Sequence, residues 1–538
     1  MSLLAWVDRN ILSLAREMRL SYLPPLMVYV AAGVSTLTGI VGTFFVKEYL
    51  GLSAEFLAAL GFWTGIPYVL KMPLGHLVDL MWRYKAALLV LGACLIGASL
   101  VIMYALIAHT EPMRALLPVE TWFVTAALIS PVGFVLQDVV ADAMTVEAVP
   151  RIDAHGEPIA QDERKLMNIT MQTLGRVAVI GGSLVVAAIN VLMFHDVQAL
   201  DPAAKAVIYA RIYALALGIP ILSLMGVALQ EAILWRERRR LRALGLQADQ
   251  ALRGLGATER VRPNLWILGG TLAFVIFTLG MGLSRQPFAA EIVLVGSMAI
   301  VLFLIAHLMR SLAPAARETL VATLLVVFAL RAIPSPGEGL TWWMIDELRF
   351  DEAFLAWLSM IGAVLTLAGM FVLRRFMAER SIVYVVGALT VVGTLSALPI
   401  LGLYHGLHHW TAALTGGLVD QRFIAIVNNA VESPLPQIAM IPVLAWVAQH
   451  APNALKATYF AVMGSFLNLA LSASQLGTKY LNGIFTVTRE VRDKATGAVI
   501  IPADYSELGQ LLVAVIAIGF LLPMGAIALV KVMRLRSA

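Results

Sequence analysis

Apolar runs of about twenty residues recur along the whole chain and constrain the fold more than any other feature. A helix needs about 20 mostly apolar residues to cross a bilayer. Of the 538 residues, 60% are hydrophobic and only 14% are charged, whereas a soluble globular protein averages about 25% charged residues. The sequence therefore predicts an all-α, polytopic membrane protein with about 14 transmembrane helices. The expected spans lie near residues 22–46, 54–73, 86–108, 121–146, 166–194, 207–230, 264–283, 290–309, 319–345, 353–373, 381–403, 424–447, 457–485 and 507–531.

The basic residues indicate how these spans are oriented. About two thirds of the 39 Lys and Arg residues fall in segments that this map places on one side, and positive charge gathers in cytoplasmic loops. We therefore expect both termini to be cytoplasmic and the protein to be multi-pass in the plasma (inner) membrane. The same rule explains the net charge of +5, so we expect the lipid bilayer and no nucleic acid as a partner. The single cysteine, Cys94, excludes an intramolecular disulfide.

The chain also repeats itself. Residues 47–60 can be laid over 345–358 without a gap, and Ser130-Pro131 recurs as Ser433-Pro434. Two duplicated six-helix halves are the architecture of the major facilitator fold, in which sites lie near the midplane between the halves. The predicted domains are a cytoplasmic amphipathic segment over 1–21, a six-helix bundle over 22–230, a basic cytoplasmic linker over 231–262, an extra transmembrane hairpin over 263–312 and a second six-helix bundle over 313–538.

Charges inside the fourth and fifth spans point to a candidate site. Asp138 and Asp142 lie one helical turn apart, and a charge at membrane depth is costly and usually functional. Two carboxylates on one face repel, which favours protonation of one of them. Arg176 lies eleven residues beyond Lys165, about 16 Å into its span, and Asp138 lies at a similar depth. Asp138 and Arg176 could form a structural pair or a switch that a proton or an anionic substrate breaks, and we favour the switch.

The second half supplies further polar candidates. Arg331 precedes Pro334-Ser-Pro-Gly337, which must interrupt the helix and free backbone groups. Gln437 extends a polar stripe that includes Asn428, Asn429 and Glu432. We assign Arg331 and Gln437 to the substrate or proton site together with Asp138, Asp142 and Arg176. A proline kink with a paired arginine is the alternative interpretation of Arg331.

The loop between the second and third spans carries a motif of its own. It resembles the major facilitator loop Gly-x-Leu-x-Asp-(Arg/Lys)-x-Gly-Arg-Arg-(Arg/Lys), although Leu80, Trp82 and Tyr84 depart from it. An aspartate here can pair with a cation or a helix N-terminus. We therefore assign a cytoplasmic gate to the matching polar positions, and a topological anchor of positive charge is the alternative. These gate residues are Gly75, Asp79, Arg83 and Lys85.

Nothing in the sequence indicates an enzyme, and we expect no cofactor. His-Glu-x-x-His, Gly-x-Ser-x-Gly and a phosphate-binding Gly-Lys-Ser/Thr loop are all missing, so any transport would be secondary. His405, His408 and His409 cluster in an outer loop, where a solvated loop is favoured over a metal site. The outer loop 486–500 alternates around Lys494-Ala-Thr-Gly497 and predicts a small β-hairpin.

The acid-bearing stretch of the fourth span resembles a pattern of the folate-biopterin transporter family, a branch of the major facilitator superfamily. The family pattern is Asp-Val-Val-Val-Asp-x-x-Val-Glu, and this chain has Gln137-Asp-Val-Val-Ala-Asp-Ala-Met-Thr-Val-Glu147. Supporting similarities lie at 45–53, 334–335, 437–444 and 457–469. The resemblance implies a monomeric symporter that takes up a folate- or pterin-like organic anion with protons. It leaves two alternatives open: a non-transporting assembly factor for a pigment-protein complex, and a facilitator-type permease for muropeptides or drugs.

Overall fold

The computed structural model describes residues 16–50, 52–69, 71, 74, 78, 84–149, 159–195, 197, 200–243, 265–284, 286–310, 314–372, 380–435, 456–492 and 499–535. In this part of the chain, nine helices are long and apolar enough to cross a membrane. Helices make up nearly all of the regular structure, which confirms the all-α membrane class. The count of 14 spans stays a prediction. The chain divides into two compact units.

Unit 1 comprises residues 1–38, 73–189 and 202–269. Its helices are η2 (Leu20–Tyr22), α3 (Leu23–Val34), η3 (Ser35–Thr38), α7 (Lys85–Ala108), α8 (Thr110–Leu116), α9 (Val119–Ala148), most of α10 (Gln161–Met193), α11 (Pro202–Ala216), α12 (Gly218–Ala243) and the start of α14 (Leu265–Leu283). Pro24 and Pro25 stand in the first turn of α3, where their missing N–H groups leave no helical bond unmade.

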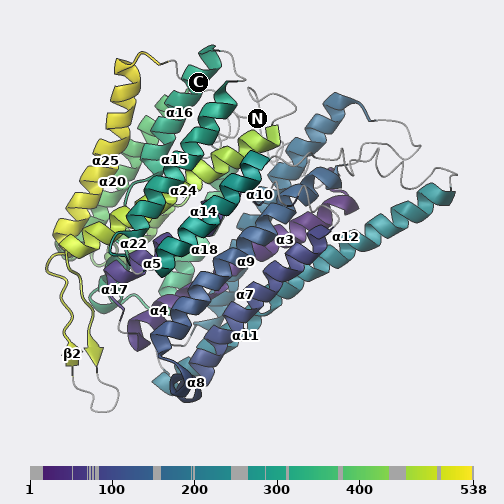
Figure 1. Cartoon of the computed structure of the whole chain (residues 1–538). Helices are drawn as coiled ribbons and strands as arrows, with labels where there is room; N and C mark the ends of the chain where they lie inside the picture. The colour runs from purple at the N-terminus through teal and green to yellow at the C-terminus, as the bar shows by residue number, and fades with distance from the viewer. Residues whose placement is uncertain are drawn as a thin grey trace. The chain divides into compact units, whose positions relative to one another are not determined.

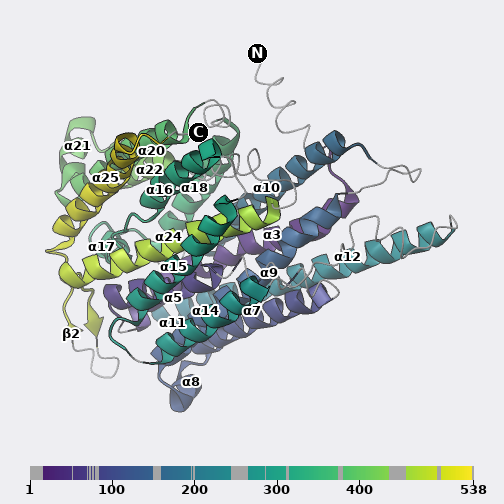
Figure 2. The same ribbon diagram turned by 45° about the horizontal axis from the view of Figure 1, so that its top comes forward.

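Glycines set the distances between the helices of unit 1. A Cβ on Gly133 of α9 would lie 2.6 Å from the backbone oxygen of Gly92 on α7. A Cβ on Gly92 would lie 2.7 Å from the backbone oxygen of Gly133. The two backbones therefore meet directly, as small residues allow in membrane helices, and both views show α7 and α9 side by side (Figures 1 and 2). Gly33 on α3 and Gly182 on α10 form a second crossing of this kind. Because α9 packs against both α7 and α3, these crossings fix the helices on either side of it.

Unit 2 comprises residues 39–72, 190–201 and 270–538. Its elements are α4 (Gly39–Tyr49), α5 (Ala54–Val69), most of α14, α15 (Ala289–Met309), α16 (Pro314–Arg331), α17 (Glu338–Asp346), α18 (Glu352–Val372), α20 (Ile382–Tyr404), α21 (Leu407–Thr415), α22 (Gln421–Glu432), α24 (Lys456–Ile484), β1 (Val491–Arg492), β2 (Val499–Ile501) and α25 (Leu508–Val532). It therefore contains α4 and α5 from the start of the chain, and α5 packs along α24. The predicted domain boundaries remain a prediction.

The internal repeat of the sequence has a matching local structure. Ser53 accepts a hydrogen bond from the backbone N–H of Phe56 at 3.0 Å and caps α5. At the equivalent position in the second half, Asp351 accepts one from Phe354 N at 2.7 Å and caps α18. Side chains at both positions thus satisfy an N–H group that a helix start leaves without an intrahelical partner.

The predicted interruption after Arg331 is present, because α16 ends at Arg331 and α17 begins at Glu338. Gly337 adopts a φ of 74° there, which suits a residue without a Cβ. The exposed backbone groups bond to a polar stripe on α24: Ser474 donates to Ile333 O at 2.6 Å and Asn482 to Pro336 O at 3.2 Å. The freed groups therefore anchor the break on a neighbouring helix.

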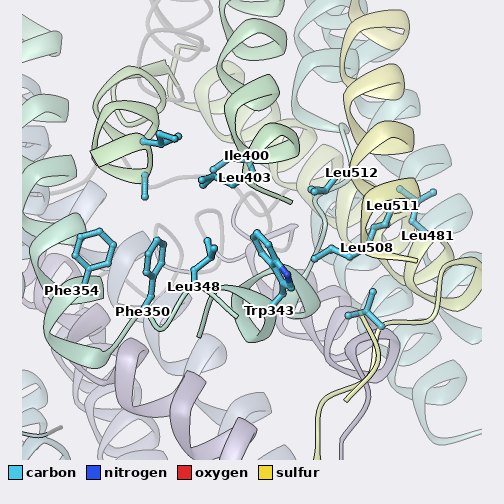
Figure 3. Packing of buried hydrophobic residues seen from close by; sticks show 13 residues of the cluster. Trp343, Leu348, Phe350, Phe354, Ile400, Leu403, Leu481, Leu508, Leu511 and Leu512 are labelled. Atoms are coloured by element: carbon cyan, nitrogen blue, oxygen red, sulfur yellow. The ribbon is translucent and has the colours of Figure 1, made fainter. Parts of the chain in front are cut away.

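Aromatic and leucine side chains fill the interior of unit 2 near its β-hairpin. Figure 3 shows Phe354, Phe350, Leu348 and Trp343 in a row that faces Ile400 and Leu403, with leucines of α24 and α25 beside them. The side chains of Leu348, Phe350 and Leu403 are at most 4% exposed. This cluster fixes the ends of α17, α18 and α20 relative to one another.

The strand pairing of the predicted β-hairpin is present, and its predicted turn at Lys494–Gly497 lies outside the described residues. Strands β1 and β2 pair antiparallel, with Val491 opposite Ile501, and Thr488 and Asp504 form a further bridge. Figure 1 shows the hairpin beyond the ends of α24 and α25. It connects two long helices and marks one end of unit 2, which we call the hairpin end.

Candidate functional site

The acid pair lies in the second half of α9. This 30-residue helix continues through Pro131 and carries Asp138 and Asp142 one turn apart, where their side chains share a face. Both residues are partly buried, whereas Val139, Val140 and Ala141 between them are at most 4% exposed. The apolar residues therefore hold the helix in place, and the acids lie on its less covered side.

Tyr29 of α3 contacts the acid pair. Its hydroxyl donates a hydrogen bond to Asp142 Oδ1 at 2.6 Å, and the tyrosine is only 8% exposed. The same hydroxyl interacts electrostatically with Asp138 and Arg176. Tyr29 of α3 and the acid pair of α9 thus form a polar cluster within unit 1, and Arg176 of α10 lies within electrostatic range of the Tyr29 hydroxyl.

Next to Arg176, α10 approaches α3 closely. A Cβ on Gly175 would lie 2.9 Å from Cε2 of the Tyr29 ring, so the ring packs against the backbone immediately before Arg176. The Arg176 side chain is exposed. The common depth of Asp138 and Arg176 stays a prediction, and both residues lie within electrostatic range of the Tyr29 hydroxyl. Tyr29 itself was not predicted, because no motif distinguishes it among the 13 tyrosines.

Gln137, next to the acid pair, has a structural role. It is 2% exposed, and its Oε1 accepts a hydrogen bond from Ser223 of α12 at 3.0 Å. Such a bond between buried side chains links two membrane helices. Gln137 therefore fixes the rotation of α9, and with it the direction of the neighbouring Asp138.

Of the predicted gate residues, the structure describes Lys85. It begins α7, is 8% exposed, and lines a small recess between α7, α9 and α12 with Met144 and Glu231. Gly75, Asp79 and Arg83 lie outside the described residues, and so does Gln437 of the predicted substrate site.

Arg331 belongs to unit 2, and its Nε donates to Leu467 O on α24 at 3.4 Å. Within the predicted polar stripe, Asn429 Nδ2 donates to Leu358 O of α18 at 2.7 Å, which is an interhelical contact. Asn428 is buried, at 8% exposure.

A second charged cluster lies at the hairpin end of unit 2. Lys47 of α4 pairs with Asp346 of α17 at 2.5 Å between Nζ and Oδ1, and the Tyr505 hydroxyl donates to Asp346 Oδ2. Arg489 donates to Val46 O and lies over the Trp342 ring, with Cζ 5.0 Å from its centre. This cluster, which we call the clasp, joins α4 to α17 and to the two ends of the hairpin loop.

Burial of the clasp changes the acidity of its side chains. Loss of water around Arg489 lowers the pKa of its guanidinium to about 10, so the group remains charged at neutral pH. Burial, and then the hydrogen bond to Asp346, raises the pKa of Tyr505. Both groups therefore keep the protonation states that their hydrogen bonds require across the neutral range.

Among the residues that the structure describes, no group of three or more His, Cys, Asp or Glu side chains could hold a metal ion. The predicted histidine cluster consists of an exposed His405 and of His408 and His409, whose tilted rings have centres 3.9 Å apart.

Comparison with a curated protein extends the sequence resemblance. The chain is 27% identical over 154 residues to the folate-biopterin transporter of Synechocystis sp. (strain ATCC 27184 / PCC 6803 / Kazusa). The match covers 29% of this chain and 30% of that protein, so it spans less than a third of the length of the relative.

Solved structures show the fold. A POT family transporter in complex with 5-aminolevulinic acid has a TM-score of 0.60 at 13% identity, covering 94% of this chain and 95% of that one. A POT family transporter in complex with a thioalcohol-conjugated peptide gives 0.59 at 14% identity, covering 96% of both chains. A mutant of the nucleoside transporter NupG gives 0.52 at 13% identity and covers 95% of this chain and 99% of that one. All three are transporters, and their likeness confirms the major facilitator fold.

A protein-family model agrees with both comparisons. It is described as the BT1 family and matches residues 32–533, which is most of the 538-residue chain. The predicted resemblance to folate-biopterin transporters is thereby confirmed at the level of the family, and the chain belongs to the BT1 family.

Proposed function

We propose that this protein is a proton-coupled secondary transporter of a folate- or pterin-like organic anion. The observation that carries the proposal is the hydrogen bond between the Tyr29 hydroxyl and Asp142, with Asp138 and Arg176 within electrostatic range of that hydroxyl. Ionisable groups inside membrane spans mark substrate and proton pathways. The family and the name of the curated relative support the substrate class.

The cluster contains the parts that coupling needs. Arg176 supplies a positive charge for an anionic substrate, and the acid pair supplies carboxylates that take up a proton. When an anion engages Arg176, the arginine stabilises the ionised acids less, so protonation of an acid becomes easier. Protons and anion then favour the same state of the transporter, which is the requirement for coupled movement.

Arg331 and Gln437 extend the proposed substrate site to the second half of the chain. Arg331 offers a second cation for a substrate with two negative charges. The proposed cytoplasmic gate consists of Gly75, Asp79, Arg83 and Lys85. Of these four residues the structure describes Lys85, which is buried. We place both termini in the cytoplasm, the protein in the inner membrane, and the working unit as a monomer.

Uptake into proteoliposomes tests this function. The purified protein is reconstituted, and labelled folate or a labelled pterin is added with and without an acidic exterior. We expect the pH gradient to accelerate uptake, and Asp138→Asn or Arg176→Ala to reduce it by about tenfold or more, which is the effect of losing one charged contact. Glu111→Gln and Arg114→Ala are matched controls, because this exposed pair on α8 lies outside the cluster.

Two results would overturn the proposal. Uptake that does not respond to the pH gradient excludes proton coupling, and uptake unchanged in Asp138→Asn and Arg176→Ala excludes the assigned site. The alternatives give different readouts in the same preparation: flux of muropeptides or drugs identifies a permease of another substrate class, and co-purification with a pigment-protein complex without flux identifies an assembly factor.

A further inference from the structure

Tyr29 lies where three helices of unit 1 meet. It comes from α3, donates a 2.6 Å hydrogen bond to Asp142 of α9, and packs its ring against Gly175 of α10. Because Tyr29 is 8% exposed, water competes little for its hydroxyl. The position of the Asp142 carboxylate therefore depends on a residue of the first span.

The hydroxyl of a tyrosine can both donate and accept a hydrogen bond. When Asp142 is ionised, it accepts from Tyr29, as in this structure. When Asp142 carries a proton, its O–H can donate to the Tyr29 oxygen instead. The pair therefore keeps a hydrogen bond in both protonation states, but the bond to the ionised carboxylate is charge-assisted and is the stronger of the two.

The Tyr29 hydroxyl also interacts electrostatically with the other charged groups near Asp142. Asp142, Asp138 and Arg176 all act on its hydroxyl. Lys85 and Glu231 lie near Val140 and Met144, which occupy a different face of α9 from the two acids. The groups that set the electrostatic environment of Tyr29 are thus three members of the proposed transport site: Asp142, Asp138 and Arg176.

We propose that Tyr29 is the positioning residue of the proton site, which orients the Asp142 carboxylate and sets the pH range over which it binds a proton. This assignment rests on the proposed function for its consequence in transport. Tyr29 acts through Asp142, and it is neither the proton carrier nor a substrate ligand.

The test compares Tyr29→Phe with Tyr213→Phe. Both variants lose one hydroxyl from a buried tyrosine of unit 1, but Tyr213 is hydrogen-bonded to Thr38 and contacts no acid of the site. Removing a donor to an ionised carboxylate makes protonation easier, so the pH profile of uptake should move toward alkaline pH by roughly one unit in Tyr29→Phe. The KM for the anion should change less than the pH midpoint, and Tyr213→Phe should keep the wild-type profile.

Infrared spectroscopy of the purified protein gives a second readout that needs no transport. The carboxylic acid C=O band that disappears in Asp142→Asn reports the protonation of Asp142, and its midpoint should rise in Tyr29→Phe but not in Tyr213→Phe. An unchanged midpoint in Tyr29→Phe, or an equal shift in Tyr213→Phe, overturns the role of Tyr29. If the wild type shows no uptake driven by a pH gradient while the band still shifts, the proposed function fails and the role of Tyr29 stands.

Discussion

Lys47 Nζ lies 2.5 Å from Asp346 Oδ1, and this pair joins the end of α4 to the end of α17. The two residues come from the two copies of the internal repeat, in which residues 47–60 correspond to 345–358. Their side chains are only 15% and 27% exposed, so solvent screens the pair less than it screens a surface salt bridge. The contact therefore ties equivalent segments of the two halves together at the hairpin end.

A double-mutant cycle on Lys47 and Asp346 should show coupling between them. We expect Asp346→Asn and Lys47→Met each to lower the free energy of unfolding by about 1–3 kcal/mol, because each leaves a partly buried partner without its counter-charge. The double variant should lose less than the sum of the two, and thermal unfolding in detergent measures this difference.

The surface pair Arg114 and Glu111 provides the control for that cycle. These residues are 42% and 78% exposed and three positions apart on α8, so their coupling should be a few tenths of a kcal/mol at most. Coupling between Lys47 and Asp346 as small as this would show that the clasp contributes no more to stability than an exposed ion pair.

Much of the fold follows from local patterns in the sequence. The apolar run at 121–146 predicts α9, which spans Val119–Ala148, and the run at 381–403 predicts α20, which spans Ile382–Tyr404. Both helices are long enough for hydropathy alone to define them. The helix break at Pro334–Gly337 and the β-hairpin also depend on local residue chemistry, since proline removes a donor and turn residues end a strand.

The partners within the candidate site could not be predicted in the same way. Tyr29 and Asp142 are 113 residues apart in the chain, and their contact depends on how closely α3 approaches α9 and α10. Glycines control that distance at Gly175 and at the Gly33–Gly182 crossing. Hydropathy identifies a helix but not the rotation that selects which polar side chain meets which.

Gly175→Ala should disturb the site without changing any charged residue. The new Cβ would lie 2.9 Å from Cε2 of Tyr29, so the ring or α10 must shift and the hydrogen bond to Asp142 weakens. We expect a loss of about 1–3 kcal/mol in unfolding free energy from overpacking, together with a lower uptake rate.

Gly181→Ala on the same helix is the matched control, because nothing lies within 4 Å of its Cβ position. This change should be neutral or stabilising by about 0.5–1 kcal/mol, since alanine favours the helix. Thermal unfolding and uptake are measured for both variants. Equal behaviour of the two would contradict the close packing of Tyr29 against α10.

The connection between α20 and α21 should weaken at acidic pH because of His408. Burial, and then the neighbouring His409, lowers the pKa of His408 below its usual value of 6.5. The unfolded chain therefore takes up a proton first as the pH falls. The stability from the neutral imidazole is complete above about pH 6.5 and is lost as the pH falls toward the folded-state pKa.

Hydrogen exchange of residues 403–419 measures this effect between about pH 8 and pH 5, after correction for the intrinsic exchange rate. Protection should fall with the pH in the wild type, and His408→Gln should remove most of this dependence. His405→Gln, at an exposed position of the same connection, should keep it. A wild-type pH dependence that survives in His408→Gln would assign the effect to another group.

Glu291 should hold α15 against α24. Its Oε1 accepts hydrogen bonds from Lys479 Nζ at 3.0 Å and from the Tyr480 hydroxyl at 2.6 Å, and the Glu291 and Lys479 side chains are each 20% exposed. Glu291→Gln removes the charge but keeps the shape of the side chain. We expect the free energy of unfolding to fall by about 1–3 kcal/mol, which is the typical contribution of hydrogen bonds to a partly buried charged group. Hydrogen exchange should increase in α15 and in the facing part of α24.

Glu318→Gln on the exposed face of α16 is the control and should change exchange in neither helix. Unchanged exchange in α15 after Glu291→Gln would mean that apolar packing alone holds the hairpin in place.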